Sequence, residues 1–218
     1  KKIPFFSSLS YDELKQIDDL IIMRKYKKGM FVFLEDEPGE ALFFIKSGQI
    51  KLSKMLETGE EQILQILKAD DIFAEVVLFD QGPYPATAEV IEDAKIGMIK
   101  SEDVNKLIKR NPEISIKILD VMSKRLRQAQ MKIRDLGLKD TRGRTASMLV
   151  KLAEEYGKET DKGIELELSL TRKEFSNLIG TSRETITRIL SDFKDDNLVE
   201  VGRKQIIVLD LTGLKKWS

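Results

Sequence analysis

Three charged side chains, Arg183, Glu184 and Arg188, fall within one six-residue stretch. A guanidinium group can donate paired hydrogen bonds to O6 and N7 of guanine, and a carboxylate can accept a hydrogen bond from N4 of cytosine. If all three lie on the exposed face of one helix, they match the chemistry that distinguishes base pairs in the major groove. The alternative interpretation is a solvated helix face on which an arginine and the glutamate form an ion pair.

The surrounding sequence predicts two short helices joined by a tight turn. Thr171 and Glu174 have the spacing of a capping box at the start of the first helix, and Gly180 supplies the turn. This arrangement is typical of a helix-turn-helix, whose second helix places its first residues in the major groove. Contacts to phosphates position such a protein without specifying sequence. We expect phosphate contacts from Thr171, Arg172, Lys173 and Thr185, and Ser182 is also expected to contact DNA.

A predicted hairpin follows the second helix. Its strands are residues 198–201 and 206–208, and its turn is Gly202-Arg203-Lys204, so we interpret it as the wing of a winged helix-turn-helix. Residues 169–191 carry four basic side chains and two acidic ones, whereas the whole chain has 37 of each sign and a net charge of zero. The predicted DNA-binding face is therefore locally basic, and this local sign matters more for phosphate binding than the total.

Two residue types are absent from the 218 residues. Without cysteine, the chain can form no disulfide, thiolate zinc site or cysteine-held iron–sulfur cluster. Without histidine, it lacks the commonest metal ligand, the usual general base and the ordinary haem ligand. We therefore expect no enzyme, no catalytic residue and no metal site. No apolar run approaches the roughly 18 residues of a membrane span, and we expect a cytoplasmic protein.

The elements that would position these residues fall into a β part and a helical part. Residues 22 to about 100 show short apolar runs separated by regular turn signals, which favours an antiparallel barrel or sandwich over βαβ units. Residues 1 to about 20 carry a short helical pattern, and residues 101–111 predict another helix. A loop rich in glycine and charge, residues 157–163, is expected to precede a strand at 164–168.

A long helix is predicted from Pro112 to Gly137. Its apolar residues alternate three and four positions apart, which is the spacing of a coiled-coil seam, and charged residues flank the stripe. The seam consists of Ser115, Leu119, Met122, Leu126, Ala129, Ile133 and Leu136. The pattern favours a dimer seam over residues 115–136. The alternative is a helix face that packs on the protein's own barrel.

Across nearly its whole length the chain resembles the CRP/FNR family of bacterial transcription regulators. The match is most specific in Leu170-Thr171-Arg172 and in residues 180–190, which look like the family's recognition helix. The resemblance implies an α+β fold with an N-terminal antiparallel β-roll of the cyclic-nucleotide-binding kind, a long dimerisation helix and a C-terminal winged helix-turn-helix. The corresponding domains are residues 1–110, 111–138 and 139–218.

The resemblance also implies function. It implies a homodimer that binds double-stranded DNA as a transcription regulator. In the catabolite-activator branch of the family, a helix with this Arg-Glu-x-x-x-Arg pattern reads half-sites of the TGTGA type. We therefore expect an operator that resembles TGTGA-N6-TCACA, read by Arg183, Glu184 and Arg188.

The predicted sensor departs from the cyclic-AMP branch of the family. That branch has a cassette of Gly-Glu-Leu followed by Arg-Ser/Thr-Ala. Glu75 and Thr87 keep their places, but Ala86 stands where the arginine would bind the cyclic phosphate, and Ala74 stands where the glycine amide would approach the ligand. A phosphate leaves water only when its charge is paired, so cyclic AMP is not expected as the effector. The missing cysteines and histidines exclude the family's iron–sulfur sensor and its usual haem sensor.

Two interpretations of the sensor stay open. In the first, an unidentified small molecule lies between the β-roll and the long helix, near Glu75, Thr87, Arg125 and Gln130. In the second, the dimer binds DNA as made and needs no effector. Gln130, with Ala129 before it, fills positions where cyclic-AMP binders use hydroxyl groups. Glu75 and Arg125 could also simply form an ion pair.

RNA polymerase is a further expected partner. Residues 156–163 lie where activators of the family touch the polymerase, although their charges are ordinary for a surface loop. The sequence does not separate an activator from a repressor. The rival to a DNA-binding protein is a β-roll dimer whose helical tail docks on another protein. Such a module would not need two arginines and a glutamate at groove-reading positions.

Overall fold

The structure, a computed structural model, describes residues 18–166, 171–202 and 205–217. The chain divides into two compact units, residues 1–126 and 127–218, and each is described by itself. The boundary between them lies inside the long helix, which therefore contributes to both units. Most of the helical pattern at residues 1–20 and the wing turn at Arg203-Lys204 fall outside the described residues.

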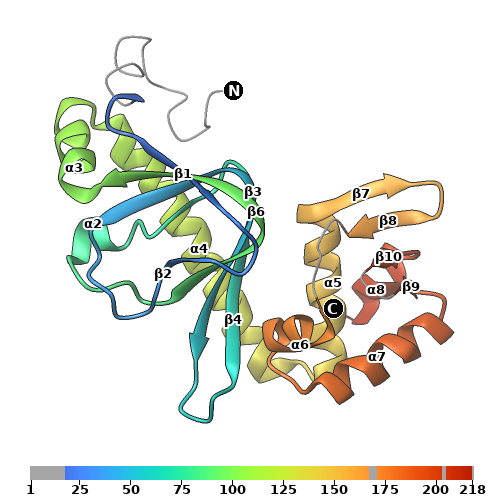
Figure 1. Cartoon of the computed structure of the whole chain (residues 1–218). Coiled ribbons are helices and arrows are strands. Elements are labelled where there is room, and N and C mark those ends of the chain that lie inside the picture. The colour runs from blue at the N-terminus through green and yellow to red at the C-terminus, as the bar shows by residue number, and fades with distance from the viewer. Residues whose placement is uncertain (1–17, 167–170, 203–204, 218) are drawn as a thin grey trace. The chain divides into compact units, whose positions relative to one another are not determined.

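The first unit is built on an antiparallel sheet of six strands (Figure 1). Its strands are β1 (Ile22–Tyr26), β2 (Phe31–Phe33), β3 (Ala41–Met55), β4 (Glu61–Leu67), β5 (Ile72–Phe73) and β6 (Thr87–Lys100). The order is β1-β6-β3-β4, with β2 paired to β6 and β5 paired to β3. Two helices, α2 (Val77–Asp80) and α3 (Ser101–Arg110), belong to the same unit. This arrangement confirms the predicted antiparallel β-roll of an α+β fold.

Aromatic rings fill the interior of the β-roll. Tyr84 stacks on Phe33 with ring centroids 3.9 Å apart, and Phe43 stacks on Phe73 at 5.2 Å. The Tyr84 hydroxyl also accepts a hydrogen bond from the Ala41 amide at 3.2 Å, as a buried tyrosine requires. Tyr84 lies in the segment where a cyclic-AMP binder would hold its phosphate, so here that segment contributes an aromatic ring to the core.

Lys51 of β3 is buried and paired with two carboxylates. Its ammonium group lies 2.7 Å from Glu61 of β4 and 3.0 Å from Glu89 of β6. Burial acts to lower the pKa of Lys51, but the two carboxylates outweigh burial and the pKa is raised. Because taking an ion out of water costs several kcal/mol, such a cation persists in the sheet only where partners on both neighbouring strands compensate it.

The long helix α4 (Glu113–Leu138) confirms the predicted helix and ends one residue beyond Gly137. Near its start, Ile114 and Ile118 are buried in a core with residues of β3 and β6. The exposed fraction is 57% for Leu119 and 63% for Leu126, two residues of the predicted seam. The β-roll therefore covers a neighbouring face of α4 and leaves these seam positions uncovered. No helix in the described ranges is both long enough and apolar enough to span a membrane.

The second unit combines a four-stranded sheet with four further helices beyond α4. Its elements are α5 (Thr141–Tyr156), β7 (Gly157–Thr160), β8 (Gly163–Leu166), α6 (Arg172–Ile179), α7 (Arg183–Asp195), β9 (Val199–Val201), β10 (Ile206–Val208) and α8 (Leu211–Trp217). The strand order is β7-β8-β10-β9, and every pair is antiparallel. Helices α6 and α7 with strands β9 and β10 confirm the predicted winged helix-turn-helix.

One expectation for this unit was wrong. The segment 157–163, predicted as a loop, contains strand β7, which pairs with β8 from Gly157 opposite Leu166 to Thr160 opposite Gly163. The sequence Gly-Lys-Glu-Thr has no alternating apolar residues, and all four residues are exposed. The backbone hydrogen bonds to β8 form the strand without help from side-chain burial. Strand β8 also begins one residue earlier than predicted, at Gly163.

Replacing Lys51 with alanine should destabilise the first unit, because Glu61 and Glu89 would keep their charges without the cation between them. Removing one partner of a buried ion pair costs about 3–5 kcal/mol. We expect a loss of that order in urea unfolding followed by circular dichroism. The matched control is Lys54→Ala, since Lys54 of the same strand pairs with Glu35 and its side chain is 47% exposed. That variant should lose less than about 1 kcal/mol. Equal losses would contradict the role given to Lys51.

Candidate DNA interface and sensor site

Helix α6 begins at a complete capping box. The Glu174 amide donates a hydrogen bond to Thr171 Oγ1 at 3.2 Å, and the Thr171 amide donates one to Glu174 Oε2 at 2.8 Å. The Thr171 hydroxyl donates to the same carboxylate oxygen. Thr171 therefore fixes the start of the helix with its hydroxyl already engaged, while Lys173, two residues later, is exposed.

The turn between α6 and α7 is fixed by one glycine and one serine. Gly180 ends α6 with φ 75°, a left-handed conformation that glycine adopts without strain. Ser182 then caps α7: its hydroxyl accepts a hydrogen bond from the Thr185 amide at 3.1 Å and lies 2.9 Å from the Thr185 hydroxyl. Both Ser182 and Thr185, predicted to contact DNA, thus also set where α7 begins.

Helix α7 buries one face and exposes the other. Its buried residues are Ile186, Ile189, Leu190 and Phe193. Arg183, Glu184 and Arg188 are all exposed. Within the described part of the chain, no ion pair involves any of these three side chains. The arginine–glutamate pair, considered above as the alternative, is therefore not found there.

Arg172 is engaged with the wing. Its Nη2 donates a hydrogen bond at 2.9 Å to the carbonyl of Gly202, which follows β9. Burial lowers the pKa of Arg172 from its ordinary value, although an arginine remains protonated in proteins. The guanidinium thus links the first helix of the pair to the wing. Sequence reasoning missed this bond because it joins residues 30 positions apart.

The structure brings together two of the four residues predicted to line an effector pocket. Arg125 Nη1 lies 2.5 Å from each carboxylate oxygen of Glu75, and Arg125 Nη2 donates to the carbonyl of Ile72. Thr87 instead accepts a hydrogen bond from the amide of Glu35 at 3.0 Å. Gln130 is exposed on the part of α4 that belongs to the second unit. Glu75 and Arg125 therefore form the ion pair that the sequence left as an alternative.

The two cassette positions that depart from the cyclic-AMP pattern are small and buried. Ala74 and Ala86 are 8% and 5% exposed. Ala74 has φ 61°, in the left-handed region that favours glycine. The backbone at position 74 thus keeps a conformation suited to glycine. The buried methyl group of Ala86, by contrast, offers no charge to a phosphate.

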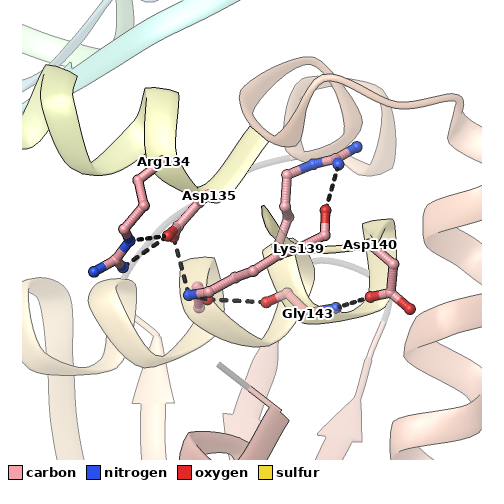
Figure 2. Close-up of polar contacts among 7 residues, drawn as sticks. Arg134, Asp135, Lys139, Asp140 and Gly143 are labelled. Carbon is pink, nitrogen blue, oxygen red and sulfur yellow. Dashed lines mark hydrogen bonds and ion pairs between the residues drawn. The ribbon is translucent and has the colours of Figure 1, made fainter. Parts of the chain in front are cut away.

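Polar contacts fix the junction between α4 and α5 (Figure 2). Asp135 accepts a hydrogen bond from Lys139 Nζ at 3.1 Å, and the same Nζ donates to Ser147 Oγ at 2.7 Å. Asp140, the N-cap residue of α5, accepts a hydrogen bond from the Gly143 amide at 2.7 Å. Only Lys139 and Asp140 separate the two helices, and the side chains of both form hydrogen bonds. The spacing of Asp135 and Lys139, four residues apart, is the one sequence signal for this contact.

Both parts of the chain match known protein families. Residues 23–111 match the cyclic nucleotide-binding domain family, and residues 143–217 match the Crp-like helix-turn-helix domain family. The chain is 32% identical over 191 residues to the CRP-like cAMP-activated global transcriptional regulator of Mycobacterium tuberculosis, covering 88% of this chain and 85% of that protein. The anaerobic regulatory protein of Bacillus subtilis is 30% identical over 202 residues, covering 92% of this chain and 85% of that protein. The chain belongs to the CRP/FNR family of transcription regulators.

Solved structures of the CRP/FNR family share the fold. A CooA variant from Carboxydothermus hydrogenoformans superposes with a TM-score of 0.81 at 26% identity, covering 97% of this chain and 93% of that one. The Mycobacterium tuberculosis relative is named as a transcriptional regulator, so membership of the family supports a regulator rather than an enzyme. Among the described residues of this CRP/FNR regulator, no group of three acidic side chains could hold a metal ion.

The stability that Asp135 contributes should depend on pH. Burial acts to raise the pKa of Asp135, but hydrogen bonds from Arg134 and Lys139 outweigh it and the pKa is lowered. Such a carboxyl group contributes stability that is complete above its unfolded pKa, near 4, and is lost as the pH falls through its folded pKa. We therefore expect Asp135→Asn to lower the Tm at neutral pH, with a difference from the parent that shrinks below about pH 4.

Calorimetry between neutral pH and about pH 3.5 measures this difference. The matched control is Asp161→Asn, because Asp161 is an exposed aspartate in the turn between β7 and β8. Its Tm difference from the parent should stay small across the range. A loss in Asp135→Asn that does not vary with pH would show that the charge of Asp135 is not what holds the junction.

Proposed function

We propose that this CRP/FNR regulator reads DNA through the first half of α7. The observation that carries the proposal is the exposure of Arg183, Glu184 and Arg188 on a helix whose opposite face is buried. The arginines suit guanine and the glutamate suits cytosine. The two arginines are five positions apart, or about 7.5 Å along the helix axis. Base pairs stack about 3.4 Å apart, so the two arginines can reach different base pairs.

The operator we propose is the palindrome TGTGA-N6-TCACA. Each half-site offers guanines on one strand and cytosines on the other. Phosphate contacts would fix the register of the helix on the duplex. The residues proposed for them are Thr171, Arg172, Lys173, Ser182 and Thr185. Lys173 is exposed, whereas Thr171 and Arg172 would contact DNA in addition to the hydrogen bonds they make to the capping box and the wing.

A palindrome is matched by a two-fold dimer, and we infer that α4 forms the dimer interface over residues 115–136. The uncovered side chains of Leu119 and Leu126 support this inference, as does Ile133, which is 70% exposed. Burying apolar area contributes about 25 cal/mol per Å². A seam of about three heptads from two chains would therefore offset the cost of association.

We infer that cyclic AMP does not control this regulator. The Mycobacterium tuberculosis relative is named as cAMP-activated, but in this chain Ala86 supplies no cation for a cyclic phosphate. Tyr84 contributes its ring to the core instead, and the guanidinium of Arg125 is already paired with Glu75. These contacts favour a dimer that binds DNA without an effector over one that waits for a small molecule at this site.

We also propose that the β7–β8 hairpin contacts RNA polymerase. Asp161 and Lys162 in its turn are exposed, and Lys162 lies 3.6 Å from Glu200 of β9. The hairpin is one edge of the four-stranded sheet of the second unit. It therefore offers a partner a fixed surface rather than the loop that the sequence suggested.

Replacing Arg183 with alanine should weaken binding to a TGTGA-N6-TCACA duplex by about 1–3 kcal/mol, which is roughly 5- to 150-fold in Kd. Binding to a scrambled duplex should change little, because phosphate contacts carry no sequence information. Fluorescence anisotropy of the ligand-free protein on labelled duplexes measures both affinities. The end point of the titration should correspond to two chains per duplex.

Lys194→Ala is the matched control, since Lys194 is an exposed basic residue in the last turn of the same helix. It should keep the parent's preference for the operator. If Arg183→Ala binds both duplexes as the parent does, α7 is not the reading element. An end point of one chain per duplex would overturn the proposed dimer.

Millimolar cyclic AMP should leave both the Tm and the DNA affinity of the purified protein unchanged. A ligand present at 100 times its Kd stabilises the folded state by about 2.7 kcal/mol, so a specific site would raise the Tm clearly. Differential scanning fluorimetry with 5′-AMP as the control nucleotide makes this comparison. A rise with cyclic AMP alone would contradict the inference drawn from Ala86.

A further inference from the structure

Arg142, in the first turn of α5, contacts the C-terminal end of α7. Its guanidinium carbon lies 4.2 Å from the ring centroid of Trp217 and 5.1 Å from that of Phe193. Nη2 donates a hydrogen bond to the carboxylate of Asp196 at 2.7 Å, and Nη1 lies 3.6 Å from that of Asp192. One side chain thus joins α5, α7 and α8.

The charges at this end of α7 show why a cation is needed there. Asp192, Asp195 and Asp196 gather where the backbone dipole of the helix already places partial negative charge. Carboxylates at a helix C-terminus are unfavourable unless a cation compensates them, and Arg142 pairs with two of the three. A planar guanidinium can also stack on the indole while its edge binds carboxylates, which a lysine ammonium cannot do.

A change of angle at this contact would move the DNA-reading end of the helix. Phe193 and Arg183 are ten residues apart, or about 15 Å along the axis. A tilt of about 5° at Phe193 would shift the first turn by about 1.3 Å. Hydrogen bonds to base edges weaken steeply with such a displacement, because their donor–acceptor distances span only about 2.7–3.2 Å.

Arg142 also lies next to the α4–α5 junction. Gly143, whose amide is bonded to Asp140, packs against the C-terminal helix: a Cβ added there would lie 3.1 Å from the carbonyl oxygen of Trp217. The first turn of α5 is thus held between the junction on one side and Trp217 on the other. All of these contacts belong to the second unit.

We propose that Arg142 is a positioning residue for DNA recognition. It acts through Asp192, Asp196 and Trp217 to hold the angle of α7 relative to the α4–α5 junction, and it touches no base. The inference rests on the proposed function, because it assumes that α7 reads the operator.

The test compares Arg142→Met and Arg142→Lys, each in the full chain. Fluorescence anisotropy measures binding to the scrambled duplex and to an operator duplex. The operator is either the palindrome or a site that the parent selects from random duplexes. Each measurement is made well below the Tm that circular dichroism gives for that variant. Arg142→Met should lose roughly 10-fold in operator affinity, equivalent to about 1.4 kcal/mol, and change little on the scrambled duplex. Arg142→Lys, which keeps a cation near Asp196, should recover part of the lost preference.

A second variant keeps the proposal falsifiable if Arg142→Met does not fold. Asp196→Asn changes a side chain that is 51% exposed and weakens its bond to Arg142. It should lower the ratio of operator to scrambled affinity in the parent. Where Arg142→Met folds, adding Asp196→Asn to that variant should leave the ratio unchanged.

The outcomes distinguish a failure of the assignment of Arg142 from a failure of the proposed function. A lower Tm with an unchanged affinity ratio in Arg142→Met and Asp196→Asn would make Arg142 merely structural and overturn its assignment alone. If the parent itself prefers no sequence, the proposed function fails and the assignment of Arg142 fails with it.

Discussion

The carboxylate of Glu75 is buried in the β-roll and requires a cation, which Arg125 of α4 supplies. Because losing one partner of such a pair costs about 3–5 kcal/mol, the pair fixes the rotation of the first half of α4 within the first unit. Arg125 lies seven residues after Ile118, so both occur on one face of the helix, and Ile118 is buried in the core. The adjacent stripe of Leu119 and Leu126 must then face away from the β-roll. The ion pair and the burial of Ile118 together thus orient the Leu119 and Leu126 positions of the proposed dimer seam.

The Glu75–Arg125 ion pair also affects whether an effector can bind at the predicted sensor site. Arg125 satisfies both oxygens of Glu75 and the carbonyl of Ile72, so an effector that used either charge would first have to replace these bonds. Tyr84 occupies part of the interior with its ring against Phe33. Of the four predicted ligand contacts, Glu75, Thr87 and Arg125 therefore already have partners within the chain. These contacts support the proposal that the protein binds DNA without a nucleotide effector.

The sequence predicted best those features whose signals are local. The capping box of Thr171 and Glu174 spans four residues, and the left-handed turn at Gly180 depends on one residue type, so both could be recognised without the fold. The partnership of Glu75 and Arg125 stayed open because it joins positions 50 residues apart. Lys51 gave no sign of burial, since lysine is almost always exposed unless it is paired. Strand β7 was missed because its side chains are exposed and only its backbone pairs with β8.

Among the described residues, the charged side chains at the start of α7 are unpaired, and two of those at its end are paired. In the first half of the helix, Arg183, Glu184 and Arg188 are exposed and have no ion-pair partner among the described residues. In the last turn, Asp192 and Asp196 are paired with Arg142. A side chain that is already paired must give up its partner before it can bind a base, whereas an exposed one exchanges only water. A chain with no net charge can therefore present a basic face to DNA, because two of the three aspartates at the far end of the same helix are paired within the protein.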